Sequence, residues 1–502
     1  MYKNLIIIIL NLFLININHA QQSGFCGTTL LDNQRIKDRM LQNRESIQSN
    51  DLRVGVITYI PISYWLSAKN DGSGRIRYVD VLLNICALNK IYVDQNIQFY
   101  LKGIFDVNNI IIYEDPSSRE GEAAINQINS INKNAINIFV TSGAVSVNLG
   151  ALAYYHYSED YIVCNGQIVN EDATILAHEL GHFFTLVHTY YPWGSLVYDC
   201  TMPTPKELDF GSTKVLVEYV DRMKDRGFHC YFSGDGFCDT PADYDQGFGW
   251  LNGCVYSGCA KDPDDVPLDP DEKNIMGDFL GCLTYYSLEQ KAAIARDLKS
   301  TRRDYLRSSV YNPPGDVSSP PINPVVVSSG FNAVTFKWES VPNATFYILE
   351  IAVLSFSNKS TYRNYILGRL DTTLTDLLAN TKYVWKVTAY NSKSICPSGT
   401  NTGTLNYRTS AQAVASHDLE SNVNDITVIP IGDYQLLIQL IAKSSGNLTF
   451  DIYDQSGKLI RSEELSFISG INSYSRKFEI SGIFSYRIYN MHNAYGGKFI
   501  SY

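Results

Sequence analysis

The spacing of apolar residues divides the chain into an N-terminal part of mixed pattern and a C-terminal part of short strands. In the first part, apolar side chains recur at helical spacing over residues 76–88, 175–187 and 288–306. Alternating apolar and polar residues predict strands at 53–60, 97–104, 135–140 and 151–163. We expect the last of these at a sheet edge, near the helix at 175–187. The pattern predicts an α+β domain over residues 52–312.

A proline-rich break follows this domain. Proline pairs at 313–314 and 320–321 predict a linker, and the residues beyond it show only short strand patterns. We expect two all-β sandwich domains there, over residues 318–410 and 420–502. Trp338 and Tyr383 fall on strands of the first and are expected in its core.

The N-terminal residues differ from both parts. Residues 1–20 combine one lysine, an apolar run and a small residue before Gln21, which is typical of a secretory signal peptide. Residues 21–51 are polar and charged, and we interpret them as a short propeptide. No later stretch approaches the roughly 20 apolar residues that a membrane span needs. We therefore expect a secreted, extracellular protein without a transmembrane segment.

Charge and cysteine content narrow the class further. The net charge of −10 argues against nucleic acid as a partner. Ten cysteines in an exported chain favour disulfide bonds over free thiols. If Cys26 and Cys396 stay unpaired, the other eight form an even set with on the order of 100 pairings, which spacing alone cannot distinguish.

The most informative segment is His178–His188. Histidines four apart on a helix share one face, so His178 and His182 can bind one metal ion from the same side. Glu179 stands where it can hold a zinc-bound water and take its proton. His188 can supply a third ligand, which leaves the fourth position open as a catalytic zinc requires. The alternative is a surface helix that carries the pattern by chance.

His188 lies six residues beyond His182, so the chain must turn sharply near Thr185 to bring it to the metal. The segment resembles the HExxHxxGxxH signature of the metzincin metallopeptidases, in which glycine makes this turn. A β-branched residue at positive φ costs about 1–3 kcal/mol. We expect either strain at Thr185 or a turn of another shape.

Further motifs, in the same order, resemble the pappalysin and cytophagalysin family of metzincins. Asn274-Ile275-Met276-Gly277 resembles the Met-turn, in which Met276 packs beneath the zinc ligands. Residues 218–220 and 234–243 resemble the block that follows the zinc motif, and residues 281–290 its C-terminal part. The resemblance covers about 52–310 and implies a twisted mixed sheet, an active-site helix, a Met-turn and a C-terminal helix.

This resemblance implies a zinc-dependent endopeptidase that hydrolyses peptide bonds in proteins bound in an extended pose. Zinc would activate the attacking water, and Glu179 would act first as base and then as acid. It also implies calcium at Asp235 and Thr240. The implied disulfides are Cys230–Cys259 and Cys254–Cys282, which leave Cys200–Cys238 and Cys86–Cys164 as the remaining pairs.

Two positions depart from the family pattern. Many members carry a tyrosine two residues after the Met-turn methionine, where this chain has Asp278. Arginine-directed relatives carry an acid at the position of Gly281, so no preference for basic residues is expected. We interpret Asp278 as a turn residue. His156 and His229 have no partner at ligand spacing and are interpreted as structural.

Cys26 lies in the predicted propeptide. Its thiolate could cap the zinc and keep the enzyme latent, as in some metzincins. The alternatives are a disulfide and a passive cysteine.

The two C-terminal blocks carry resemblances of their own. Residues 320–410 resemble a fibronectin type III module. Residues 450–460, 482–488 and 497–500 resemble the C-terminal sorting domain of the type IX secretion system, which implies the secretion machinery as a partner and attachment to the cell surface as one fate. A second adhesive or carbohydrate-binding sandwich is the alternative.

Two other functions stay open at this point. A catalytically inactive metzincin-fold protein used for adhesion would be compatible with Thr185 and Asp278, although an intact Glu179 argues against it. A hydrolase of another bond, such as an amide in a cell-wall peptide, would use the same zinc site. In each case we expect a monomer.

Overall fold

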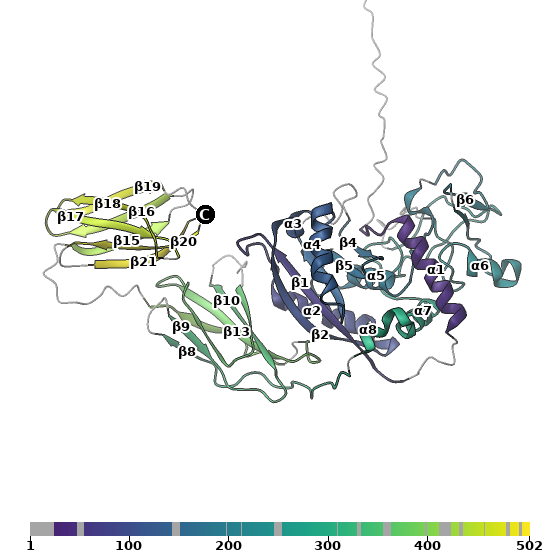
Figure 1. The fold of residues 1–502 in the computed structure, drawn as a ribbon, viewed down its shortest axis with the longest axis horizontal. Coiled ribbons are helices and arrows are strands. Elements are labelled where there is room, and N and C mark those ends of the chain that lie inside the picture. Colours follow the sequence, from purple (N-terminus) through teal and green to yellow (C-terminus); the bar gives the residue numbers. More distant parts are fainter. Residues whose placement is uncertain are drawn as a thin grey trace, which may run out of the picture.

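The structure is a computed structural model of the 502-residue chain. It describes residues 25–47, 55–142, 151–244, 254–328, 333–354, 363–410, 423–430, 435–477, 482–490 and 494–501, without residues 197, 212, 309, 397, 398 and 456. The predicted signal peptide lies outside the described residues. Figure 1 shows mixed α/β structure in the N-terminal part and two sets of strands in the C-terminal part.

A mixed sheet organises the N-terminal domain. Its strands are β1 (Thr58–Ala68), β2 (Ile97–Asn108), β3 (Ile136–Thr141), β4 (Ala153–His156) and β5 (Tyr161–Asn165), in the order β2-β1-β3-β5-β4. The first four of this order run parallel, and β4 pairs antiparallel at the edge. The predicted edge strand is therefore confirmed for β4, whereas β5, from the same predicted run, lies inside the sheet.

Helices cover both faces of this sheet because successive strand residues point to opposite sides. Trp65 packs with residues of α3 (Ile110–Glu114) and α4 (Arg119–Ser130) on one face. Tyr64 and Leu66 pack on the other face with α2 (Tyr78–Ile91) and α5 (Thr174–Phe183). Two short 3₁₀ turns, η2 (Val93–Gln95) and η3 (Gly166–Ile168), lead from α2 and β5.

The C-terminal helix of the domain is shorter than the pattern predicts. Helix α7 (Leu288–Lys299) begins with the predicted capping box between Ser287 and Gln290. It ends at Ser300, which has an extended backbone (φ −64°, ψ 155°). The chain continues as η7 (Thr301–Arg303) and α8 (Asp304–Arg307), so one helix over 288–306 is wrong.

The predicted propeptide contains a helix that the spacing of apolar residues does not predict. Helix α1 (Leu30–Ser46) starts at the N-cap Thr29, whose hydroxyl accepts the N–H of Asp32 at 3.1 Å. It buries polar residues as well as apolar ones, among them Lys37 and Arg39. Figure 1 shows it lying across the domain beside α7, with which it makes direct contacts.

The segment between α5 and α7 is rich in loops. Its described elements are η4 (Trp193–Ser195), β6 (Glu207–Asp209), β7 (Lys214–Leu216), η5 (Lys224–Gly227) and α6 (Phe228–Phe232). Disulfides join these loops, and a small apolar cluster of their own, which includes Trp193, Val217 and Tyr244, packs between them.

The disulfide pairing differs in part from the expectation. The structure joins Cys254 to Cys282, as expected. Cys230 is joined to Cys238 and not to Cys259, because the tight loop after α6 brings their Cα atoms to 5.1 Å.

The remaining expected pairs are also wrong. Cys259 is joined to Cys200. Cys86 is joined to Cys396 across 310 residues, while Cys164 is buried within the sheet as a free thiol. This last disulfide links α2 to the second domain.

The second domain consists of two facing sheets, β11-β10-β13-β14 and β12-β9-β8. Its strands are β8 (Val325–Ser328), β9 (Val334–Lys337), β10 (Phe346–Val353), β11 (Arg363–Leu367), β12 (Asp371–Leu374), β13 (Lys382–Tyr390) and β14 (Leu405–Arg408). Trp338 and Tyr383 lie in its core, as predicted. Its loops also contact the first domain, where Leu101 N–H donates to Ser392 O at 3.0 Å. Tyr311, which precedes the second domain, stacks on Tyr100 and hydrogen-bonds through its hydroxyl to Oγ of Ser392 at 2.9 Å.

The C-terminal domain is a second pair of sheets, β15-β16-β19 and β18-β17-β20-β21. Its strands are β15 (Val423–Pro430), β16 (Gln435–Ala442), β17 (Gly446–Tyr453), β18 (Leu459–Phe467), β19 (Gly470–Lys477), β20 (Gly482–Tyr489) and β21 (Ala494–Ser501). The two sheets enclose an apolar core that includes Phe450 and Ile488. Among the described residues, no helix has the length and apolar character needed to cross a membrane.

Candidate metal centre

Helix α5 presents two histidines to the same buried space. It starts at Thr174 with Ala173 as its N-cap residue, and Asp172 supports this start by accepting the Thr174 N–H at 3.1 Å. His178 and His182, one turn apart, are completely buried. The helix thus fixes two imidazoles on one face.

A sharp turn follows and delivers the third histidine. Thr185 has φ +72°, in the left-handed region, which confirms that the chain strains a β-branched residue here. The Leu186 N–H donates to Gly181 O at 2.8 Å and closes the turn. His188 is thereby brought back over the helix face that carries His178 and His182.

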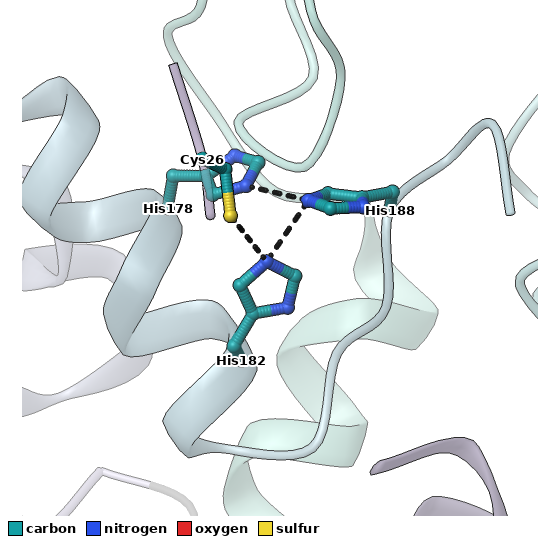
Figure 2. Close-up of side chains that lie close together, drawn as sticks. All are labelled: Cys26, His178, His182 and His188. Atoms are coloured by element: carbon teal, nitrogen blue, oxygen red, sulfur yellow. Dashed lines mark hydrogen bonds between the residues drawn. The ribbon is translucent and has the colours of Figure 1, made fainter. Parts of the chain in front are cut away.

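The three imidazoles converge through their Nε2 atoms (Figure 2). Nε2 of His188 lies 3.0 Å from Nε2 of His182 and 3.1 Å from Nε2 of His178. Sγ of Cys26 lies 3.4 Å from Nε2 of His182, and all four atoms lie within 4.8 Å of one another. A tetrahedral zinc ion would separate two nitrogens by about 3.3 Å and nitrogen from sulfur by about 3.6 Å. The spacing fits such an ion.

Hydrogen bonds fix which nitrogens face the centre. The Nδ1 atoms of His178 and His182 donate to the carbonyl oxygens of Ile275 at 2.7 Å and Leu186 at 2.8 Å. Because a carbonyl only accepts, the Nε2 atoms of these rings carry lone pairs toward the centre. Burial lowers the pKa of His178 to about 4, so a proton does not balance these lone pairs at neutral pH. A bound cation could do so.

Glu179 lies beside the histidines and is completely buried. Neither carboxylate oxygen makes a well-formed hydrogen bond to any described residue. Burial raises the pKa of Glu179 to about 8, and the nearby Cys26 thiol and Tyr155 N–H offset this only in part. A buried carboxyl group without well-formed hydrogen bonds can exchange a proton with a neighbouring group such as water.

Met276 packs against the helix that carries His178 and His182. Its Sδ would lie only 2.3 Å from a Cβ atom at position 181, so Gly181 lets the methionine approach α5 closely. The Thr189 N–H donates to Met276 O at 3.1 Å and joins this methionine to the residue that follows His188.

The other polar residues that follow Met276, and the two remaining histidines of the domain, have partners of their own. Tyr286 is buried and donates to Ala177 O, while Tyr285 is partly exposed and donates to Asp271. Asp278 is half-buried, and burial together with the charge of Asp243 raises its pKa to about 7. His156 and His229 bond to local backbone, as expected of structural residues.

The N-terminal segment covers the centre. Residues 25–27 lie along the edge strand β4, where the Gly27 N–H donates to Ala153 O at 2.8 Å and the Leu152 N–H donates to Phe25 O at 2.7 Å. This pairing is parallel, and it brings the Cys26 thiol to the histidines. Cys26 is not in a disulfide, which removes one of the alternatives for this residue. Burial raises the pKa of its thiol, and the charge of Glu179 raises it further.

Asp235 and Thr240 form a separate buried group. The Thr240 hydroxyl donates to Oδ2 of Asp235 at 2.9 Å, and the Phe237 N–H donates to Oδ1 at 2.9 Å. Burial raises the pKa of Asp235, and the charge of Glu218 raises it further. In the sequence analysis Glu218 is part of a motif without an assigned role. In the structure its charge acts on Asp235, so it belongs to the same buried group.

Comparisons with known proteins give no family for the chain. No family model matches it, and no curated protein matches it. Two solved domains are similar to parts of it at 20% identity: the FN5 domain of Drosophila Lar, covering 19% of this chain and 99% of that domain with a TM-score of 0.16, and the fn3 domain of human collagen alpha-1(XX), covering 22% and 98% with a TM-score of 0.17.

Proposed function

We propose that this chain is a secreted zinc-dependent endopeptidase of the metzincin type. The observation that carries the proposal is the convergence of three buried imidazoles, with Nε2 of His188 at 3.0 and 3.1 Å from Nε2 of His182 and His178, next to the buried carboxyl group of Glu179. His178, His182 and His188 would hold the zinc ion. Once bound, zinc supplies a Lewis acid that polarises a carbonyl group and lowers the pKa of water.

The protein residues supply the proton transfers and the substrate alignment. Glu179 takes a proton from the attacking water and passes it to the leaving amine. Strand β4 offers the edge along which an extended peptide aligns, since its backbone groups already pair with residues 25–27. Burial of the histidines and of Glu179 limits competing contact with water.

The arrangement of the N-terminal segment supports a latent state. Cys26 stands at the fourth corner of the metal site, where substrate and water would otherwise enter. Residues 25–27 use the backbone groups of β4 that an extended substrate needs. Removal of this segment would open both the metal site and the strand edge.

Other parts of the proposal concern cofactors and location. The group around Asp235 and Thr240 offers hard oxygen ligands for calcium. The four disulfides among the described residues suit an extracellular protein. We further propose that the C-terminal domain addresses the chain to the secretion machinery and that the module before it spaces the enzyme from that address.

The test compares the chain from residue 51 to its C-terminus with the Glu179→Gln variant of the same length. Both are produced as the full chain and then cut after residue 50, bound zinc is counted, and casein and gelatin cleavage is followed. We expect one zinc in each protein and cleavage by the wild type alone. The residues beyond 312 are kept because without them the protein would lose the Cys86–Cys396 disulfide and its neighbouring contacts.

Two outcomes would contradict the proposal. Zinc without cleavage in either protein would favour a metzincin-fold binding protein. Absence of zinc in both would show that the histidines do not form a metal site. Cleavage of a cell-wall peptide amide, with none of casein or gelatin, would change the substrate class and leave the zinc site intact.

A further inference from the structure

A polar cleft lies along the seam between helix α1 and the domain that it covers. It has a volume of about 380 Å³, which is within the range of small-molecule sites. One wall is α1, with Arg35, Asp38 and Arg39, and the other includes the junction of α7 and η7, with Ser300 and Arg302. The cleft is therefore complete only while the N-terminal segment is docked, and guanidinium groups line it from both sides.

Arg39 is the buried guanidinium group of this cleft. The residue is 8% exposed, and its Nη2 donates to Oδ1 of Asp297 and to Oγ of Ser300, the latter at 3.2 Å. Its Nη1 is buried and has no acceptor among the described residues. A buried charged donor without an acceptor is strongly unfavourable, so Nη1 requires an acceptor that enters the cleft from outside.

The charges around Arg39 do not balance. Arg303 is buried and pairs with Asp160 at 2.6 Å and with Asp297 at 2.8 Å. Arg302 lies 3.7 Å from Asp160, too far for a hydrogen bond, and donates instead to a backbone carbonyl oxygen. Three guanidinium groups therefore share two carboxylates, which leaves one positive charge in excess.

The other carboxylates near the cleft do not remove this excess. Asp38 lines the cleft but is exposed, and it forms no ion pair with an arginine in the described part of the chain. Asp32 pairs with Arg35 at 3.4 Å, at a partly exposed position where such a pair contributes little. Burial lowers the pKa of Arg39, and repulsion by the neighbouring guanidinium groups lowers it further against the charge of Asp297. An anion in the cleft relieves this repulsion.

The donors indicate which anion the cleft suits. Planar guanidinium groups present paired N–H donors that match the oxygen atoms of a phosphate group. Several of them around one cleft favour a ligand that carries more than one negative charge, as phosphate does near neutral pH. The cleft has on the order of ten times the volume of a water molecule, so it can also admit the organic part of a small phosphate ester.

We propose that this cleft binds a phosphate group, free or as a small ester, through Arg35, Arg39 and Arg302. The ligand joins α1 to the α7–η7 junction, so phosphate binding and docking of the N-terminal segment strengthen each other. Phosphate then favours the docked state, and its loss favours release. The effect on latency rests on the proposed function, whereas the binding of phosphate does not.

The first experiment measures phosphate binding by titration calorimetry to the full, zinc-loaded chain in a Glu179→Gln background, so that peptidase activity plays no part. Sodium phosphate and glycerol 2-phosphate are the titrants, and the protein is compared with versions that also carry Arg302→Gln or Arg119→Gln. Arg119, exposed at the start of α4, is the matched control for the loss of one charge. We expect Arg302→Gln to weaken binding by at least about tenfold, because a hydrogen bond to a charged group is lost, and the control to leave it unchanged.

The two titrants distinguish the sources of the phosphate group. Tighter binding of glycerol 2-phosphate assigns the cleft to an ester, and equal or tighter binding of inorganic phosphate assigns it to the free ion; both support the proposal. No binding of either titrant at millimolar concentration, or equal binding to the parent and to Arg302→Gln, overturns it. Zinc is counted in every sample, so failure of the phosphate site is distinguished from failure of the zinc site.

A second variant and a second measurement serve if Arg302→Gln does not fold. Arg35→Gln removes a guanidinium group from the α1 wall, where the side chain is 46% exposed and contributes little to folding. A protease recognition site inserted at residue 50 allows the chain to be cut between α1 and β1, and dissociation of the N-terminal fragment is followed in sodium phosphate and in NaCl of equal ionic strength. Slower release in phosphate that is lost in Arg35→Gln supports the proposal. Release indifferent to phosphate, or slowed equally in Arg35→Gln, refutes it.

Discussion

The turn between the second and third histidines allows a direct test of how the zinc motif is stabilised. Thr185 has φ +72°, and its buried hydroxyl has no partner among the described residues. We consider two successive changes, Thr185→Ala and then Ala to Gly at the same position. The first removes the hydroxyl and the methyl group, and the second removes only the Cβ atom.

The two substitutions test different contributions to the free energy of unfolding. Loss of the buried methyl group costs about 1 kcal/mol, while removal of an unpaired buried hydroxyl returns about 1–3 kcal/mol, so the first step nearly cancels or stabilises. In the second step, relief of the left-handed conformation gains about 1–2 kcal/mol. Greater freedom of glycine in the unfolded chain costs about 0.4–1 kcal/mol. We therefore expect the glycine variant to be more stable than the alanine variant by about 0.5–1 kcal/mol.

Hydrogen exchange is the suitable assay because the chain has several domains and its unfolding is not two-state. Protection of the α5 amides in the zinc-free protein should increase from the alanine to the glycine variant, with zinc affinity unchanged or higher in glycine. Lower protection in glycine than in alanine would refute the assignment of strain to position 185. Unchanged protection in β17, in the C-terminal domain, is the internal control.

Three further outcomes follow from the same structure. Cys26→Ala should keep one zinc per chain yet cleave casein before the N-terminal segment is removed; unchanged latency would contradict the role of the thiol. Gly181→Ala should destabilise the domain by about 1–3 kcal/mol, because its Cβ would displace Met276, and differential scanning calorimetry against a Gly368→Ala control, where an added Cβ meets no atom, measures this. Burial raises the pKa of Asp160, but the charge of Arg303 outweighs this and holds the pKa at about 2, below its unfolded value. This ion pair therefore contributes about 2 kcal/mol to the free energy of unfolding. The contribution is present above about pH 4 and is lost as the pH falls toward 2. Asp160→Asn should remove that part of the acid dependence, and an unaltered acid transition would refute it.

The part of the site that the sequence predicts well is local. The three histidines and Glu179 lie within eleven residues, and helix periodicity alone sets two of the ligands on one face. The sharp turn at Thr185 also follows from spacing, because His188 cannot reach the metal on a continuous helix. Met276 required a motif, since nothing in the spacing from His178 indicates that it lies beneath α5.

Features that depend on contacts between residues far apart in the chain are predicted poorly from the sequence, and helix α1 is the main example. Helix α1 buries Lys37, Arg39 and Asn43, and Asp297 accepts hydrogen bonds from the last two. Apolar residues do not recur at helical spacing on such a face, so Thr29, as a possible N-cap, is the only local signal that predicts the helix. Lys37 of this helix donates to the carbonyl oxygens of Phe232 and Gly234, which lie 195 and 197 positions away along the chain, and no local pattern indicates such contacts.

Of the expected disulfides only Cys254–Cys282 is confirmed. Cys86–Cys396 was missed because its cysteines lie 310 positions apart, whereas Cys230–Cys238, eight positions apart, was missed because the expectation followed the family resemblance.

The bond between Cys86 and Cys396 alters what a cut in the connecting segment does. A protease that cleaves near the prolines at 313–321 would break the chain but would not separate the two domains. The products would migrate as one species on a non-reducing gel and as two after reduction. Such a cut would therefore not release the N-terminal domain from an anchor at the C-terminal domain, whereas a cut beyond residue 410 would free the first two domains together. With the disulfide intact, no single cut sheds the N-terminal domain alone.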